Sequence, residues 1–117
     1  MKRLGLYTIA FALLALAAVG ARWFTASTAA PEIAFTTLTG EKFTTAGLRG
    51  KVVLVNFWAT SCVVCVKEMP AIIATYDKYR ERGFETVAVA MAYDPPSYVL
   101  DYVSRHRLPF KVALDPT

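Results

Sequence analysis

The sequence predicts an α/β domain with a parallel sheet, preceded by an apolar helix at the N-terminus. Within residues 51–115, strand-like apolar runs alternate with amphipathic helical patterns in the order strand, helix, strand, helix, strand. Such an alternation is typical of right-handed crossovers between parallel strands. Residues 4–21 contain no charged residue and are apolar on every side, which sets them apart from a helix that covers a sheet.

The N-terminus has the features of a membrane-targeting segment. Lys2 and Arg3 precede the charge-free run of residues 4–21, whose length is near the minimum for a bilayer span. The basic and aromatic residues 22–24 are typical of an interfacial belt, which favours a retained anchor. The small residues 19–21 leave a cleaved signal peptide as the alternative, and a buried core helix is the third interpretation.

These features divide the chain into three parts. We expect a signal anchor or signal peptide over residues 1–24, a small polar linker over residues 25–30 and a folded domain over residues 31–117. The net charge of the chain is +4, but the domain alone has ten basic and nine acidic residues. The basic excess therefore describes membrane topology and gives no reason to expect a nucleic-acid partner.

The predicted location follows from that topology. Because a basic start stays on the cytoplasmic side, we expect a protein of the inner (cytoplasmic) membrane whose domain faces the periplasm or the cell exterior. Secretion to the periplasm after signal cleavage is the alternative. In either case the cysteines of the domain meet an oxidising compartment.

The domain is predicted to begin with a hairpin. Residues 32–38 and 41–45 are short alternating runs on either side of Thr39 and Gly40, a dipeptide that favours a turn. Residues 51–58 are β-branched and aromatic without alternation, which predicts a strand buried on both faces.

The remaining elements follow in order. A helix is predicted to begin at Cys62 and to bend at Pro70, which cannot donate a backbone hydrogen bond. A second strand over residues 84–93, a second helix capped by Asp94 and a third strand over residues 110–115 complete the pattern. The first helix has an apolar stripe at helical spacing, formed by Cys65, Met69, Ile72, Ile73 and Tyr76.

Cys62 and Cys65 are the two cysteines of the chain, and they lie where the first parallel strand gives way to the helix. In an α/β sheet, chemistry gathers at this carboxyl edge. The free N–H groups and the dipole of a helix N-terminus favour a thiolate, so Cys62 is the predicted nucleophile. Cys65 lies one turn further on the same face and is the predicted resolving thiol, which attacks the mixed disulfide and releases the substrate.

Four neighbouring residues complete the predicted site. Glu68 lies close to Cys65 along the helix. If it is partly buried, its carboxylate would disfavour a thiolate nearby and could exchange a proton with Cys65, whereas a solvated Glu68 would do neither. Trp58, Ser61 and Val63 are candidates for substrate contact, with packing beside the thiols as the favoured role of Trp58.

Other uses of two cysteines differ in the ligands they need. Both cysteines could be structural and buried. Zinc takes about four ligands and the sequence adds only His106, so no metal site is predicted. Cu(I) needs only two thiolates, which leaves a Cu(I) carrier as the main alternative beside an inactive protein. A peroxidase of the peroxiredoxin type is a weaker option, and no cofactor is predicted.

The domain resembles the thioredoxin superfamily, and within it the exported TlpA-like or ResA-like thiol-disulfide oxidoreductases. The resemblance rests on four segments in order, which are PEIAFTTLTGEKF, KVVLVNFWAT, CVVCVKEMP and LPFKVALDPT. It implies a thioredoxin-like fold with an added N-terminal hairpin. It also implies that Cys62 and Cys65 are the redox pair, that Trp58 is the aromatic residue before it and that Glu68 tunes it.

The resemblance further implies partners. Members of this family commonly reduce disulfides of exported proteins, such as apocytochromes c during cytochrome c maturation, and take electrons from a membrane thiol donor. Ser61 and Val64 depart from the family pattern, which usually has Trp and Pro there. The family pattern also continues with a cis-Pro loop, two strands and a helix beyond this sequence. We therefore expect a C-terminally incomplete fold in which the strand of residues 51–58 has an open side.

Overall fold

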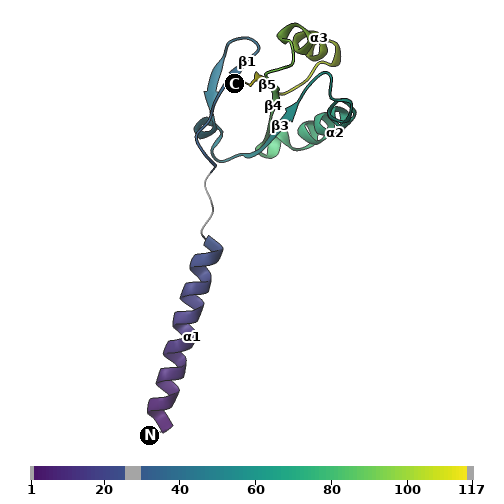
Figure 1. Cartoon of the computed structure of the whole chain (residues 1–117). Helices are drawn as coiled ribbons and strands as arrows, with labels where there is room; N and C mark the ends of the chain where they lie inside the picture. Colours follow the sequence, from purple (N-terminus) through teal and green to yellow (C-terminus); the bar gives the residue numbers. More distant parts are fainter. Residues whose placement is uncertain (1, 26–29, 116–117) are drawn as a thin grey trace. The chain divides into compact units, whose positions relative to one another are not determined.

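The computed structural model describes residues 2–25 and 30–115, and the chain divides into two compact units at the boundary between Ala30 and Pro31. The first unit contains helix α1 (Lys2–Thr25), shown in Figure 1. In the part of the chain that the structure describes, no helix qualifies as a candidate membrane span. The predicted linker falls largely on residues 26–29, which lie outside the described residues.

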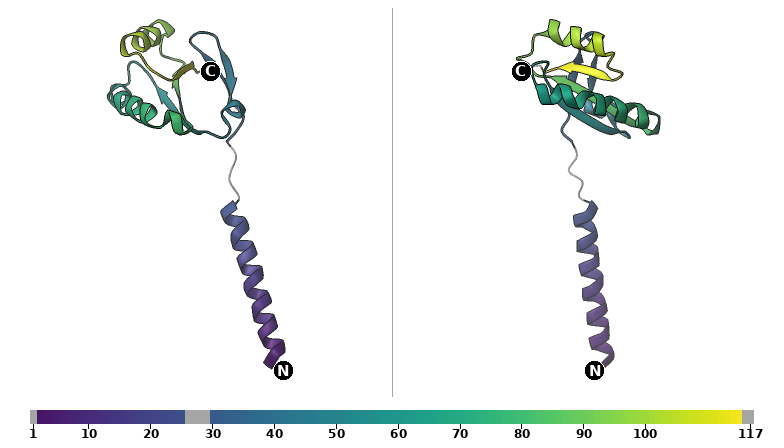
Figure 2. Two further views of the ribbon diagram at one scale, coloured as in Figure 1. Left: turned by 180° about the vertical axis from the view of Figure 1, so that it is seen from behind. Right: turned by 90° about the vertical axis from the view of Figure 1, so that its right-hand side faces the viewer.

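The second unit is built on a mixed sheet of five strands in the order β2-β1-β5-β4-β3 (Figures 1 and 2). β1 (Ala34–Thr37) pairs antiparallel with both β2 (Lys42–Thr44) and β5 (Lys111–Leu114). β4 (Phe84–Ala90) lies parallel between β5 and β3 (Val52–Trp58). The predicted α/β fold, with an N-terminal hairpin and a parallel βαβαβ portion, is confirmed.

Two helices connect the parallel strands. α2 (Val63–Tyr79) joins β3 to β4, and α3 (Pro96–His106) joins β4 to β5. Short 3-10 turns, η1 (Thr45–Leu48) and η2 (Arg80–Arg82), precede β3 and follow α2. Because successive right-handed crossovers along one direction of a sheet place their helices on the same side, α2 and α3 both cover one face (Figure 2).

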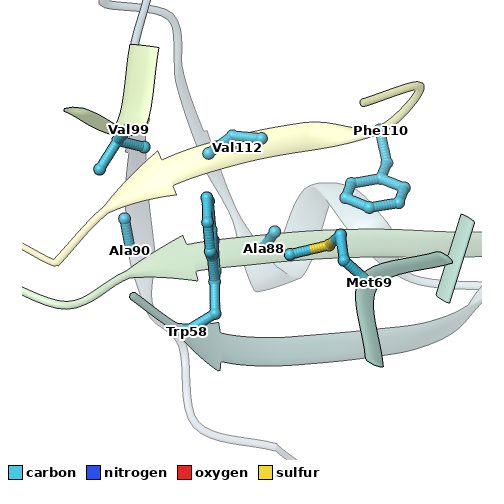
Figure 3. Packing of buried hydrophobic residues seen from close by; sticks show 7 residues of the cluster. All are labelled: Trp58, Met69, Ala88, Ala90, Val99, Phe110 and Val112. Carbon is cyan, nitrogen blue, oxygen red and sulfur yellow. The ribbon is translucent and has the colours of Figure 1, made fainter. Parts of the chain in front are cut away.

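The main core lies between these helices and the sheet. Its centre is formed by Trp58 from β3, Met69 from α2 and Val99 from α3, each at most 1% exposed (Figure 3). The predicted stripe of α2 packs against this cluster, so the helical periodicity read from the sequence is confirmed. Phe110 and Val112 close the core from the chain around β5.

The opposite face of the sheet has a smaller cluster that reaches β3 only at Val53. Further along the same face of β3, Val55 and Phe57 are exposed, with 59% of Phe57 accessible. The expectation that this strand is buried on both faces was wrong. Its outer edge pairs with no strand among the described residues, and the second cluster does not extend far enough to cover it.

Candidate functional site

The two cysteines lie on the turn that carries the chain from β3 into α2. Cys62 is the N-cap of α2, with an extended backbone at φ −84° and ψ 97°. Its backbone N–H donates to the carbonyl of Ala59 (3.1 Å), and its own carbonyl accepts from the N–H of Val66 (3.0 Å). These two bonds hold Cys62 at the point where the turn closes and the helix begins, at the carboxyl edge of the parallel strands.

Cys62 and Cys65 are joined by a disulfide, with their Cα atoms 5.3 Å apart. The backbone N–H of Cys65 donates to Cys62 Sγ across 3.3 Å, so the sulfur occupies the position of an N-capping oxygen. Both cysteines are partly buried. The pairing predicted from the spacing is confirmed, while the division into nucleophile and resolving thiol stays a prediction.

This geometry favours negative charge on Cys62 Sγ when the disulfide opens. A helix N-terminus has backbone N–H groups without carbonyl partners and the positive end of the helix dipole. Both stabilise a thiolate relative to a thiol. The Cys65 N–H that already points at Cys62 Sγ is therefore available to a thiolate without any rearrangement of the helix.

The turn before Cys62 is held by Asp94, which lies in the loop between β4 and α3. Asp94 follows β4, and its carboxylate accepts two hydrogen bonds of 2.6 Å from Thr60, one from the backbone N–H and one from Oγ1. The prediction that Asp94 caps α3 was wrong. Pro95 is the N-cap of α3, with no side-chain capping bond, and the Asp94 carboxylate bonds to Thr60 in the turn before Cys62 instead.

The other predicted site residues divide between core and surface. Trp58 is 1% exposed, so it supports the turn from within the core and offers no surface to a substrate in this structure. Ser61 and Val63 are exposed beside Cys62, with 66% of Val63 accessible. Glu68 is exposed on α2. The burial on which its predicted tuning of Cys65 depended is absent, and its catalytic role stays a prediction.

A hollow of about 350 Å³ adjoins the turn at Thr60 and is otherwise lined by α3. Within its wall, Tyr102 packs against Trp58 at a ring-centroid distance of 5.0 Å and stacks on His106 at 3.9 Å. Burial raises the pKa of the Tyr102 hydroxyl above its ordinary value. This hollow was not predicted from the sequence, because it forms only where α3 lies beside the turn at Thr60.

The ligands available at this site are few. Among residues 2–25 and 30–115, no group of three His, Cys, Asp or Glu side chains is placed to hold a metal ion. The two sulfurs of Cys62 and Cys65, once reduced, are the soft ligands that the site itself offers.

Comparison with known proteins places this site in a family. The family model described as Redoxin matches residues 25–117. A curated relative, thiol-disulfide oxidoreductase ResA of Bacillus thuringiensis (strain Al Hakam), is 41% identical over 86 residues, which are 74% of this chain and 49% of the relative. The chain thus spans about half the length of the curated relatives it matches.

Solved structures show the same likeness in three dimensions. A thiol:disulfide interchange protein of the thioredoxin family from Chlorobium tepidum TLS is 31% identical, with a TM-score of 0.70 over 75% of this chain and 60% of that one. A secreted disulfide oxidoreductase of Mycobacterium tuberculosis, homologous to DsbE of E. coli, is 26% identical, with a TM-score of 0.63 over 71% of this chain and 60% of that one. The chain belongs to the Redoxin family, as a ResA-like and TlpA-like member of the thioredoxin superfamily.

Proposed function

We propose that the protein is an exported, membrane-tethered thiol-disulfide oxidoreductase that exchanges disulfides with protein substrates through Cys62 and Cys65. The observation that carries the proposal is the Cys62–Cys65 disulfide at the N-terminus of α2, with the Cys65 N–H donating to Cys62 Sγ. A pair held in this way can open to a stabilised thiolate and close again without moving the helix.

In the reducing direction, the Cys62 thiolate attacks one sulfur of a substrate disulfide. The substrate S–S bond breaks, one substrate sulfur leaves as a thiolate, and a mixed disulfide with Cys62 forms. The Cys65 thiolate then attacks Cys62 Sγ, the mixed disulfide breaks, and the second substrate sulfur leaves. Two electrons pass from the pair to the substrate, and the Cys62–Cys65 disulfide is the other product. The reverse sequence oxidises a substrate dithiol.

The proposed partners are exported proteins with thiols or disulfides, including apocytochromes c, and a membrane thiol donor that reduces the Cys62–Cys65 disulfide again. Support comes from curated relatives named thiol-disulfide oxidoreductases and from the secreted relative among the solved structures. The exposed Ser61 and Val63 are the proposed surface next to Cys62 against which a substrate chain lies.

The proposed tether is the N-terminal segment. Support comes from the charge-free run of residues 4–21 and from Lys2 and Arg3 in front of it. The test is alkaline extraction of membranes from cells that express the full chain with a C-terminal tag. We expect the wild-type chain to stay in the membrane pellet and a Leu13→Arg/Leu14→Arg variant to leave it. Recovery of the wild-type chain in the soluble fraction would contradict the tether.

The activity is tested by following the reduction of insulin disulfides with the full chain and a thiol reductant. We expect the wild-type chain to accelerate the reaction, and Cys62→Ser and Cys65→Ser to remove the acceleration, while Thr75→Ser, a conservative change at an exposed residue of α2, keeps it. Cu(I) affinity of the reduced chain is measured by competition with a chelator. Tight Cu(I) binding without any acceleration of insulin reduction would contradict an oxidoreductase and favour a copper carrier.

A further inference from the structure

Asp94 and Thr60 connect two loops that leave the sheet side by side. Trp58 at the end of β3 is in register with Ala90 at the end of β4, and the Met91 N–H donates to the Trp58 carbonyl (3.0 Å). The two chains therefore run out of the sheet together at its carboxyl edge. Asp94 meets Thr60 just beyond this point, two residues before Cys62.

The two hydrogen bonds between the Asp94 carboxylate and Thr60 are called the clamp below. Asp94 is 4% exposed, and each of its two carboxylate oxygens accepts from a different donor of the same residue, Thr60. Its own backbone N–H donates to the Met91 carbonyl (2.9 Å), which fixes the loop that carries it. A buried carboxylate with both oxygens matched to two donors is more costly to disturb than an exposed ion pair.

Alternative roles for this carboxylate are not supported by its contacts. It forms no capping bond with α3, whose N-cap is the next residue, Pro95. Among the described residues its side-chain partners are the two donors of Thr60, so its hydrogen bonds act on the redox turn. The two bonds fix one end of the turn, and the bond from the Cys62 N–H to the Ala59 carbonyl (3.1 Å) closes the other.

We propose that Asp94, acting through Thr60, is a positioning residue that holds Cys62 Sγ against the N-terminus of α2 when the disulfide is open. The proposal rests on the proposed redox function of the pair. In the disulfide form the covalent bond to Cys65 already fixes the place of the sulfur. In the dithiol form the turn alone does so, and the clamp stabilises the reduced form more than the oxidised form.

Loss of the clamp is therefore expected to weaken the thiolate and to favour the disulfide. We expect the equilibrium of the full chain with reduced and oxidised glutathione to shift toward the Cys62–Cys65 disulfide by about tenfold in Asp94→Ala, the size of one charge-assisted hydrogen bond. The rate at which iodoacetamide alkylates Cys62 at neutral pH should fall in the same variant, because the thiolate is the nucleophile.

Conservative variants separate positioning from charge. Asp94→Asn can still accept from the Thr60 N–H and donate to Thr60 Oγ1, so it should recover much of the wild-type equilibrium although it removes the charge. Thr60→Ser keeps the hydroxyl and should behave like wild type, whereas Thr60→Val should shift the equilibrium in the same direction as Asp94→Ala. Asp77→Asn, at an exposed carboxylate of α2, is the matched control.

The proposal is overturned if Thr60→Val and Asp94→Ala fold with a wild-type melting temperature and keep wild-type equilibria and alkylation rates. It is also overturned if Asp94→Asn shifts the equilibrium toward the disulfide as far as Asp94→Ala, because the hydrogen bonds to Thr60 would then not be what holds the sulfur. Loss of the Asp94 charge alone acts in the other direction, since a nearby carboxylate disfavours a thiolate. If Asp94→Ala does not fold, the proposal is decided by comparing the equilibrium and the alkylation rate of Thr60→Val with those of Thr60→Ser. Both readouts report on the cysteine pair itself, so they remain decisive even if the chain fails to reduce insulin.

Discussion

The backbone N–H of Cys65 donates to Cys62 Sγ across 3.3 Å, and this bond lies inside the ring that the disulfide closes. Cys62 is the N-cap and Cys65 the third helical residue, which is the spacing at which N-cap side chains ordinarily accept. The sulfur therefore meets the helix N-terminus through Cys65, and the residues between the cysteines are not needed for that bond.

Val64→Pro tests this arrangement at the position where related sequences usually have proline. Val64 is exposed in the first turn of α2, where a backbone N–H has no carbonyl partner and proline is tolerated. We expect the melting temperature of the variant to lie within a few degrees of that of the wild-type chain. Its glutathione equilibrium should change by less than about threefold. Circular dichroism and alkylation after glutathione equilibration measure the two quantities. A large shift in the equilibrium would show that the Val64 N–H itself stabilises the thiolate.

Glu68→Gln tests the predicted tuning acid. Because Glu68 is exposed, water and salt screen its charge from the cysteines, and we expect the glutathione equilibrium to change by less than about threefold. Lys67→Gln, the neighbouring exposed charge on α2, is the matched control. A tenfold shift for Glu68→Gln alone would support the catalytic role predicted from the sequence.

Replacing Trp58 is expected to lower the stability of the domain. It is buried in the main core, and its indole Nε1 has no hydrogen-bond partner in the part of the chain that the structure describes. Trp58→Ala should lower the free energy of unfolding by about 3–5 kcal/mol because it leaves a cavity. Trp58→Phe keeps most of the packing and loses no hydrogen bond, so it should cost less than about 1.5 kcal/mol.

Urea unfolding of the variants measures the difference. Tyr93→Ala, at a side chain that is 68% exposed, is the control and should stay within about 0.5 kcal/mol of wild type. Equal losses for Trp58→Phe and Trp58→Ala would mean that the indole N–H has a partner that stabilises the fold.

The edge of the sheet at β3 is expected to promote self-association of the chain. β3 pairs with β4 on one side only, and among the described residues its outer edge pairs with no strand. Such an edge with exposed apolar side chains can pair with another chain. We expect Phe57→Lys to reduce association of the full chain at high concentration, because the added charge points from the open face of β3. Leu100→Lys, at an exposed apolar residue of α3, is the control. Light scattering measured as a function of protein concentration checks this. If Phe57→Lys and Leu100→Lys reduce association equally, the added charge raises solubility in general and the β3 edge is not the cause.

Local patterns in the sequence were sufficient to predict much of this fold. The hairpin, the alternation of strands and helices and the stripe that contains Cys65 and Met69 depend on residues close together in the chain. The disulfide-bonded pair was predictable for the same reason, since Cys62 and Cys65 are one helical turn apart. Glu68 lies outside the Cys65–Met69 stripe, so the helical periodicity already indicated an exposed position.

Features that depend on distant parts of the chain were not predicted. The exposed face of β3 was missed because no local pattern specifies that the second cluster reaches this strand only at Val53, although its open edge was expected from the resemblance. Asp94 stands directly before two prolines, a local signal for a helix start that outweighed its position after a buried strand. The rule that placed Cys62 at the carboxyl edge of the sheet applies equally to the chain after β4, and it was the signal that could have found the contact with Thr60.

The most direct test of the account is the mixed disulfide that the proposed reaction requires. The Cys65→Ser chain is reduced, mixed with a disulfide-containing exported protein, quenched with acid and analysed by non-reducing electrophoresis and mass spectrometry. We predict a stable covalent complex through Cys62, and none with Cys62→Ser under the same conditions. A complex that forms equally well with Cys62→Ser, or with neither variant, would contradict Cys62 as the nucleophile of a thiol-disulfide exchange.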